Sequence, residues 1–113
     1  MNKSKYIFSN ALVDLAQTRL GSKIVFKTDD FFASANRIIN PAPPIFKEGT
    51  FDKHGKWMDG WETRRRRRKG HDYLIIKLGK PGRISKVDID TSHFSGNHPA
   101  QASLQACYSN KRI

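Results

Sequence analysis

The sequence predicts a mainly β fold of the sandwich or jelly-roll type. Three observations favour this class: short runs rich in β-branched and aromatic residues, turns that contain Gly and Pro, and an antiparallel order in the second half of the chain. A chain of 113 residues is long enough for one domain and too short for two. Its 37% of apolar residues can supply a modest core.

A short helix is predicted at the start of the chain. Ser9 or Asn10 can cap its first turn, and apolar residues recur near helical spacing as far as Leu20. Gly21 can end this helix in the left-handed conformation, which glycine adopts without strain. Residues 23–27, Lys-Ile-Val-Phe-Lys, then predict a strand that runs into a turn.

The remainder of the chain predicts one long loop and three more strands. Prolines and a glycine break both regular periods between residues 40 and 52, which predicts a surface loop. Strands are predicted over 73–78, 84–90 and 102–108. A sandwich usually needs about seven or eight strands, and this sequence offers fewer. We therefore expect an incomplete sandwich whose last strand lacks a neighbour to cover its edge.

The formal net charge of +11 is compatible with an anionic partner such as nucleic acid, an acidic membrane surface or a carboxylate substrate. No run approaches the roughly 18 apolar residues of a membrane helix, and the first residues lack the apolar region of a signal peptide. A soluble intracellular protein is expected. The single cysteine, Cys107, lies in an apolar run and is predicted to pack in the core rather than to act as a reactive thiol.

The strongest candidate for a functional site is the segment 55–65, Gly-Lys-Trp-Met-Asp-Gly-Trp-Glu-Thr-Arg-Arg. It concentrates two tryptophans, two acids and two arginines between glycines. Arginine can hold a carboxylate through two parallel bonds, and Asp59 and Glu62 can accept N–H bonds from a ureido or guanidinium group. Alternatively, Trp57 and Trp61 are core anchors beside solvated charges. The spacing leaves both interpretations open.

Acidic residues at strand ends form a second candidate. Asp29 and Asp30 follow the strand 23–27, and Asp90 closes the strand 84–90. Loops at strand ends commonly carry functional side chains, and these acids suit a general base or a metal ligand. Because neighbours on an extended chain point apart, a tight pair between Asp29 and Asp30 is not expected. One of the two can cap the following turn.

Several other chemistries have no support in the sequence. The four histidines include no pair at zinc-site spacing and have no partner cysteine, so no metal and no other cofactor is predicted. Carboxylate and histidine ligands that converge in space remain open. The chain has no glycine-rich phosphate loop, no nucleophile elbow around a serine, and no cysteine beside an activating histidine. Covalent catalysis is therefore not expected.

Five arginines and a lysine form the run 64–69. Taken alone, this run predicts a nuclear localisation signal or a nucleic-acid patch that contacts phosphates. The run lies between a Trp-Glu-Thr motif and the Gly-His-Asp that leads into a strand. Alternate members are therefore expected to point into the domain. A structural arginine cluster and a binding module both stay open at this point.

These motifs resemble the allantoicase (allantoate amidinohydrolase) family. The resemblance rests on Thr-Asp-Asp-Phe-Phe-Ala at 28–33 and on the long motif at 55–65, and it covers residues 9–108 in order. The run 64–69 departs from the family pattern, in which two arginines precede one further basic position. The shorter matches are Gly70-His71-Asp72, Ile76-Lys77-Leu78-Gly79, Pro81-Gly82, Asp88-Ile89-Asp90-Thr91, Phe94-Ser95-Gly96-Asn97 and Ala102-Ser103-Leu104-Gln105-Ala106.

The resemblance implies a galactose-binding-like jelly roll that occurs as two tandem repeats. Residues 1–113 match only the first part of the first repeat, without the second. It also implies a homo-oligomeric hydrolase that converts allantoate and water to ureidoglycolate and urea in purine degradation, located in the cytoplasm or in peroxisomes. No cofactor and no membrane contact is implied. A basic nucleic-acid-binding module that uses Arg64–Lys69 is the alternative function.

The resemblance finally implies roles for individual residues. One of the two arginines at the end of the long motif is implied to hold the substrate carboxylate. The acids implied in ureido contacts or base catalysis are Asp29, Asp30, Asp59, Glu62 and Asp90. The residues implied in substrate binding are Lys56, Trp61, Arg64, Arg65 and His71.

Overall fold

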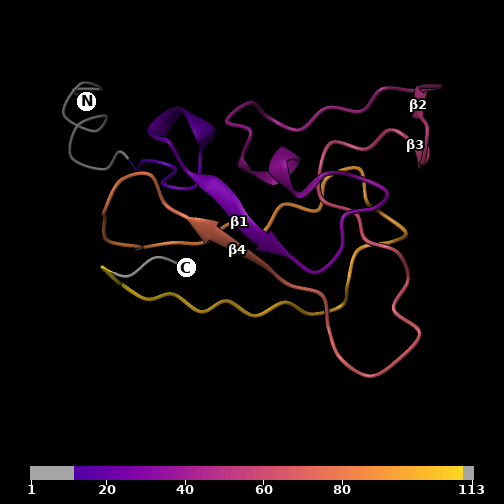
Figure 1. Ribbon diagram of the computed structural model, residues 1–113. Helices are drawn as coiled ribbons and strands as arrows, with labels where there is room; N and C mark the ends of the chain where they lie inside the picture. Colours follow the sequence, from indigo (N-terminus) through magenta and orange to yellow (C-terminus); the bar gives the residue numbers. More distant parts are fainter. Residues whose placement is uncertain (1–11, 111–113) are drawn as a thin grey trace.

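The computed structural model describes residues 12–110, and strands are its main regular elements (Figure 1). In this range the helices are short 3-10 turns, and none has the length and apolarity to cross a membrane. The elements confirm the mainly β class. In chain order they are η1 (Thr18–Leu20), β1 (Lys23–Lys27), η2 (Ala35–Ile39), β2 (Phe51–Asp52), β3 (Gly55–Lys56) and β4 (Leu74–Lys77), where η marks a 3-10 helix.

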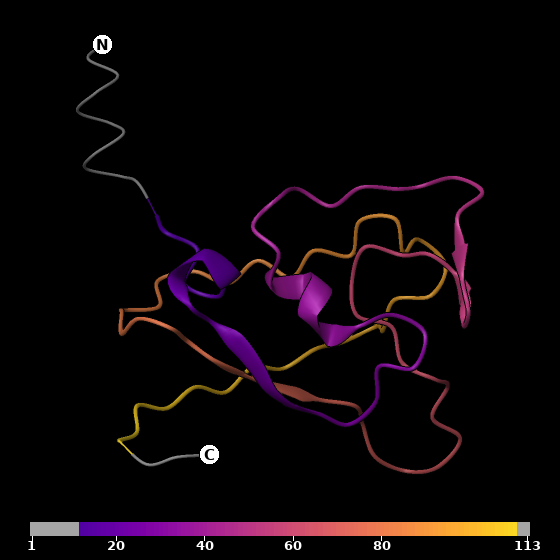
Figure 2. The same ribbon diagram turned by 45° about the horizontal axis from the view of Figure 1, so that its top comes forward.

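The antiparallel pair of β1 and β4 forms the centre of the molecule (Figures 1 and 2). Lys23 faces Lys77 at one end, and the register shifts at a bulge between Ile24 and Phe26. A bulge increases the local twist of a strand and bends it. The strand predicted over 23–27 is confirmed, and that predicted over 73–78 is confirmed within its two ends.

A second sheet is the short hairpin of β2 and β3, which lies at the far end from η1 (Figure 1). The prediction of a loop over 40–52 holds as far as Thr50, but the hairpin was not predicted. Gly55 has φ 136, a value that side chains with a Cβ rarely adopt, so glycine permits this tight turn. The carboxylate of Asp52 accepts a bond from the His54 N–H at 2.8 Å.

The core is small and lies between β1, η2 and the motif 55–65. η2 packs on β1, as Figure 2 shows. The Ser34 hydroxyl accepts the Asn36 N–H at 3.2 Å and starts η2. Arg37 then ties η2 to the long motif, because its Nη1 donates to the Met58 carbonyl at 2.6 Å. The buried apolar residues are Ala33, Ala35, Ile39 and Met58.

The prediction of an N-terminal helix is wrong for the described part of that segment. Ser9 and Asn10 lie outside the described residues, and only the single turn η1 is helical. Gln17, directly before η1, has an extended backbone with φ −72 and ψ 145, which stops a helix from forming across it. The predicted left-handed end is confirmed, since Gly21 has φ 90.

The strands predicted over 84–90 and 102–108 are wrong as well. Neither segment forms a strand, and within residues 12–110 no backbone hydrogen bond joins either one to another segment. Alternation decides which side chains share a face, but a strand also needs a neighbouring backbone about 4.8 Å away. Four strands in two separate pairs therefore replace a continuous sandwich. Cys107 is exposed, so its predicted core position is wrong too.

Candidate functional site

Two open clefts, each of 410 Å³, adjoin the segment that follows β1. They divide the neighbours Asp29 and Asp30 between them. The cleft here named the arginine cleft is lined by Thr28, Asp29, Arg64, Arg65, Arg66, Arg67, Arg68 and Asp72. The cleft here named the aromatic cleft is lined by Asp30, Phe31, Phe32, Ala33, Ser34, Arg37, Asp52 and His54.

Asp29 fastens the motif 55–65 to the end of β1. Arg64 Nε and Nη2 donate to Asp29 Oδ1 at 2.9 and 2.7 Å, and the Arg64 backbone N–H donates to Oδ2 at 2.7 Å. Trp61 Nε1 donates to the Asp29 carbonyl at 2.6 Å. Burial opposes ionisation of Asp29, but the bonds from Arg64 outweigh it and lower the pKa of Asp29 below its ordinary value. Asp29 is therefore a fixed carboxylate.

A parallel clamp joins the start of β4 to the end of β1. Thr28 Oγ1 donates to Asp72 Oδ1 at 2.7 Å, and Arg66 Nη2 donates to the same oxygen at 3.1 Å. The Tyr73 N–H donates in turn to Thr28 Oγ1 at 3.1 Å. The Thr28 hydroxyl and then Arg66 lower the pKa of Asp72, although burial opposes them. Neither Asp72 nor Arg66 was among the predicted site residues, but Asp72 ends the Gly-His-Asp motif.

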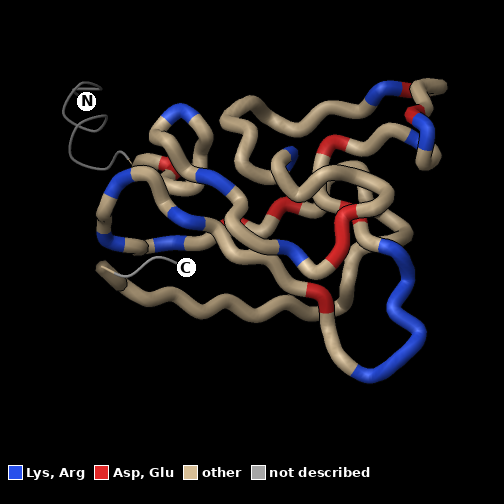
Figure 3. Tube along the Cα trace, viewed as in Figure 1, with Lys and Arg blue, Asp and Glu red and all other residues tan. Residues whose placement is uncertain are grey.

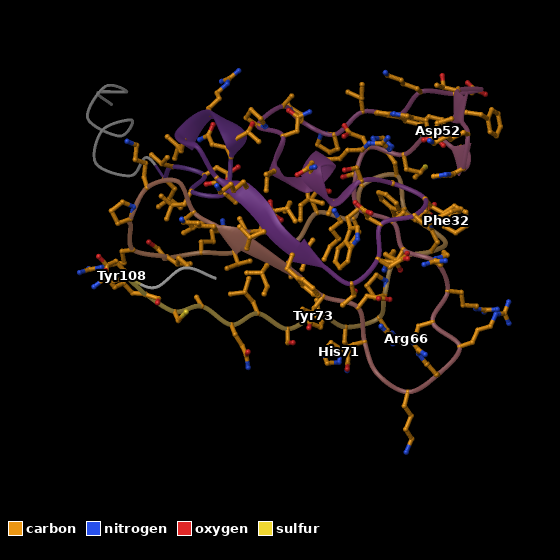
Figure 4. The ribbon with its side chains drawn as sticks, in the orientation of Figure 1. Phe32, Asp52, Arg66, His71, Tyr73 and Tyr108 are labelled. Atoms are coloured by element: carbon orange, nitrogen blue, oxygen red, sulfur yellow. The ribbon has the colours of Figure 1, made fainter. Side chains whose placement is uncertain are left out.

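The arginine run alternates between ion-paired and unpaired members over its first four residues, but among 64–69 only Arg66 is partly buried. Arg64 and Arg66 bond to the acids Asp29 and Asp72, and the Arg64 side chain is still 65% exposed whereas that of Arg66 is 26% exposed. Arg65 and Arg67 are exposed and, within residues 12–110, have no ion-pair partner. Arg66 Nε is buried without a hydrogen-bond partner. Figure 3 shows the run as a continuous basic loop, and Figure 4 places Arg66 on that loop near His71. Two arginines thus stabilise the fold, and Arg65 offers a free guanidinium in the arginine cleft.

The aromatic cleft contains Asp30 in a structural role. Asp30 Oδ2 accepts the Ala35 N–H at 3.1 Å and lies 3.9 Å from Lys27 Nζ. This bond confirms that one of the two neighbouring acids caps the following turn. His54 stacks on Phe31 with ring centroids 4.1 Å apart, and its Nδ1 lies 2.7 Å from the Phe31 carbonyl oxygen. Asp29 and Asp30 point to separate partners, so no carboxylate pair forms.

The other predicted acids lie outside the linings of both clefts. Asp59 Oδ2 accepts the Ile45 N–H at 2.9 Å and so holds the long loop. Glu62 Oε2 accepts the Asn97 side-chain amide at 3.0 Å, and the Glu62 backbone bridges to Ala33. The Ser92 hydroxyl and backbone N–H both bond to the exposed Asp90, and these bonds lower the pKa of Asp90.

Lys56, Trp61 and His71 are likewise dispersed. Lys56 belongs to β3 and does not line the arginine cleft. Its Nζ lies 4.6 Å from the centroid of the Phe46 ring. His71 is exposed, with its ring centroid 5.9 Å from that of Tyr73. Of the predicted residues, the structure brings together Asp29, Trp61, Arg64 and Arg65. In residues 12–110, no three His, Cys, Asp or Glu side chains are placed to hold a metal ion.

A family model described as the allantoicase repeat matches residues 13–112. The matched residues include β1, β4, the linings of both clefts and the long motif. The chain belongs to the allantoicase family.

Relatives and solved structures agree with this family. A probable allantoicase of Pseudomonas fluorescens (strain SBW25) is 59% identical over 96 residues, which cover 85% of this chain and 29% of that protein. A probable allantoicase of Acinetobacter baylyi is 57% identical over 99 residues, 88% of this chain and 30% of that protein. The crystal structure of allantoicase from Saccharomyces cerevisiae matches with a TM-score of 0.50 and 37% identity, over 68% of this chain and 22% of that one. The chain thus spans about 29% of the length of its Pseudomonas relative.

Proposed function

We propose that this chain contributes to an allantoicase, which hydrolyses allantoate to ureidoglycolate and urea. The observation that carries the proposal is the arginine cleft, where Asp29 fixes Arg64 by three bonds and leaves the neighbouring Arg65 exposed. Allantoate carries one carboxylate, for which a guanidinium is the matching partner. Membership in the allantoicase family supports this substrate.

The reaction requires one proton acceptor and one proton donor. The oxygen of water forms a bond to the carbon that carries the carboxylate, and the bond from that carbon to one ureido nitrogen breaks. One proton leaves the water, one proton is added to the departing nitrogen, and the products are ureidoglycolate and urea. A general base must therefore lie beside the reacting carbon and have a pKa suited to accept a proton.

Among the predicted acids, Glu62 is our candidate for this base. The lowered pKa values of Asp29 and Asp90 make these two carboxylates poor proton acceptors. Asp30 and Asp59 each hold a backbone N–H that shapes a loop. Glu62 does not line the arginine cleft, but it precedes the cleft residues Arg64 and Arg65 in the same segment. Asn97 orients one of its carboxylate oxygens and leaves the other without a hydrogen-bond partner in residues 12–110.

We assign the remaining predicted residues to supporting roles. Trp61 positions Asp29 through its indole N–H and thereby Arg64. Lys56 and His71 stay candidate contacts to the distal ureido group. The nucleic-acid alternative has less support, because ion pairs with Asp29 and Asp72 already engage the guanidinium groups of Arg64 and Arg66.

We further propose the architecture of the complete enzyme. Residues 1–113 would form the first part of the first of two tandem repeats, each a galactose-binding-like jelly roll, in a cytoplasmic homo-oligomer. The support is the share of the relatives that the chain spans and the similarity to the S. cerevisiae allantoicase. The Pseudomonas and Acinetobacter relatives are bacterial proteins, so they give no support to a peroxisomal location.

Urea release from allantoate tests the proposal. The 113-residue chain is assayed alone and as a hybrid, in which the unmatched remainder of the P. fluorescens relative follows it. In an active form, we expect Glu62→Gln to lower kcat by at least about 100-fold, in line with the loss of a general base. Arg65→Met is expected to raise KM by about 10-fold or more, since a charge-assisted bond contributes roughly 1.5–3 kcal/mol.

The matched control is Arg83→Met, which removes an exposed arginine outside both clefts. Its kinetics are expected to equal those of the parent. Full activity of the Glu62→Gln hybrid would exclude Glu62 as the base, and an inactive parent hybrid would contradict the allantoicase proposal itself.

A further inference from the structure

The arginine cleft contains more positive charge than its own acids balance. Five arginines and two acids line it, so three positive charges remain when each acid is set against one arginine. The two acids each engage one arginine in the ion pairs described above. The cleft arginines that form no ion pair in the described part of the chain, here named the outer arginines, are Arg65, Arg67 and Arg68. All three are exposed, so the excess charge faces solvent.

The two ion pairs hold the backbone that carries the outer arginines. Arg64 Nη2 lies 2.7 Å from Asp29 Oδ1. Arg66 Nη2 lies 3.1 Å from Asp72 Oδ1. Arg65 is therefore held on both sides, and the next outer arginine directly follows the second ion pair. A site on a backbone that is already held loses less conformational freedom when a ligand binds.

Gly70 closes the loop against Arg66. Gly70 has φ 121, a value that residues with a Cβ rarely adopt. A Cβ at this position would lie 3.3 Å from Arg66 Nη1, so the loop backbone packs on this guanidinium. Arg66 thus belongs to the base of the loop, and the outer arginines belong to its exposed part. Figure 3 shows this loop as a continuous basic stretch that projects from the rest of the chain.

The outer arginines repel one another. Even in a fully extended chain, the Cα atoms of Arg65 and Arg68 are at most about 11 Å apart. Salt at 0.1 M screens exposed charges only beyond about 10 Å, so it screens this repulsion only in part. A bound anion would relieve the repulsion, and it would do so more completely if it had more than one negative charge. Guanidinium groups also bind phosphate oxygens through two parallel bonds.

We propose that the outer arginines bind an anion with two negative charges on its oxygen atoms, of the class of a phosphate monoester or inorganic phosphate. The carboxylate of allantoate has one negative charge and would leave two of the three excess charges of the cleft unbalanced. A phosphate monoester has a charge of about −1.5 to −2 at pH 7 and three strong acceptor oxygens. It therefore balances more of this excess than a carboxylate does.

The backbone of a nucleic acid is the other source of phosphate groups. Each of its phosphodiesters has a single negative charge, and affinity for it arises from many phosphates along an extended basic surface. The outer arginines instead line a single cleft of 410 Å³. A cleft with three excess charges favours one small anion of higher charge over a row of singly charged phosphodiesters.

The anion site overlaps with the proposed substrate site at one residue. The proposed function assigns the allantoate carboxylate to Arg65, and Arg65 is also one of the outer arginines. A bound phosphate monoester would therefore exclude the substrate carboxylate and act as a competitive inhibitor. This consequence rests on the proposed function, whereas the anion site itself does not.

An NMR titration of the 113-residue chain tests the anion site with two matched probes. Methyl phosphate is a monoester with nearly two negative charges at pH 7, whereas dimethyl phosphate is a diester with one. At constant ionic strength, we expect methyl phosphate to shift the backbone amide signals of residues 64–69 and to bind at least about 10-fold more tightly than dimethyl phosphate. Equal affinities for the two probes would overturn the inference.

Two matched variants locate the site. Arg67→Met removes an outer arginine and is expected to weaken methyl phosphate binding by about 5-fold, the size of effect typical of an exposed ion pair. Arg83→Met removes an exposed arginine outside both clefts and is expected to leave the affinity unchanged. Both variants change the net charge equally. Equal losses of affinity would show that net charge, and not the cleft, attracts the anion, and would overturn the inference.

A thymidine oligonucleotide without terminal phosphates tests nucleic acid as the ligand, because it contains phosphodiesters only. We expect Arg67→Met and Arg83→Met to weaken its binding to the same small extent. A loss of oligonucleotide affinity in Arg67→Met alone, without a loss of methyl phosphate affinity, would assign the outer arginines to nucleic acid and overturn the inference.

Kinetics of the active hybrid test the competition with substrate. We expect methyl phosphate to raise the KM for allantoate without changing kcat, and dimethyl phosphate at the same ionic strength to have a much smaller effect. Binding of methyl phosphate by a hybrid that releases no urea would support the anion site and contradict the proposed function. An active hybrid whose KM does not respond to methyl phosphate would contradict the shared use of Arg65.

Discussion

The strand patterns of residues 22–78 form paired strands, whereas those of residues 79–110 do not. In the first region β1 and β4 pair, and two acid–arginine clamps join segments far apart in sequence. The second region also contains two segments with a strand pattern, 84–90 and 102–108, but neither pairs with another segment. Charges are abundant in the first region and absent beyond Phe94 in the second. A strand pattern is therefore not sufficient to form a strand, because a strand also needs a neighbouring strand to pair with. Within residues 12–110, only the first region provides such neighbours.

The junction of the two regions gives the largest expected effect. A Cβ on Gly79 would lie 2.0 Å from the Leu20 carbonyl oxygen, which is backbone and has little room to move. We expect Gly79→Ala to destabilise the chain by about 3 kcal/mol or more, measured by guanidinium unfolding with tryptophan fluorescence. Gly96→Ala is the control in the second region, where no atom lies within 4 Å of the added Cβ. Equal stability of the two variants would remove the contrast.

The Asp72 clamp gives the next effect. Asp72→Asn removes the ion pair with Arg66, which we expect to cost about 1–2 kcal/mol at pH 7. Because the pKa of Asp72 is lower in the folded chain, its contribution is present above the unfolded pKa near 4 and is lost as the pH falls through the folded pKa. The difference from the parent should therefore shrink below about pH 4.

The control for this clamp is Asp88→Asn, an exposed acid of the second region without a hydrogen-bond partner in residues 12–110. Unfolding measured from pH 7 down to pH 2 should give the same curve for this variant and the parent. A constant difference between Asp72→Asn and the parent at every pH would show that the stabilising effect of Asp72 does not depend on its charge.

Arg66→Lys should have a smaller effect. Lysine keeps the charge but loses the planar guanidinium that bonds Asp72, so we expect a loss of about 0.5–1 kcal/mol. Arg67→Lys changes an exposed neighbour and should alter the Tm by less than the error of the measurement. If the two lysine variants melt at the same temperature, the inward and outward members of the arginine run are equivalent, contrary to the structure.

Leu104→Lys in the chain alone should have the smallest effect. Its side chain is 58% exposed, and exposed substitutions usually change stability by no more than about 0.5 kcal/mol. Thermal unfolding followed by circular dichroism measures the change. A loss above about 2 kcal/mol would mean that Leu104 is buried in solution, since only buried leucines cost that much.

Much of the site was predictable, but its connections were not. The strand pattern 23–27 predicts that Asp29 and Asp30 lie just after the end of β1. It also predicts that their side chains point to different partners, as they do. The bond from Arg64 to Asp29 spans 35 residues, and no local pattern indicates which acid an arginine will meet. The sequence interpretation named Arg64 or Arg65 for the substrate carboxylate, and it did not indicate the bond between Arg64 and Asp29.

The amino-acid sequence by itself determined the mainly β class, the strand 23–27, a strand within 73–78, the left-handed Gly21 and the inward position of Arg66 in the arginine run. These features depend on local backbone preferences and on the period of two along an extended chain. Only the tertiary structure decided that β1 pairs with β4, that Asp72 holds Arg66, and that 84–90 and 102–108 do not form strands. Pairing needs two backbones to meet in space, and this depends on which segments are present to meet.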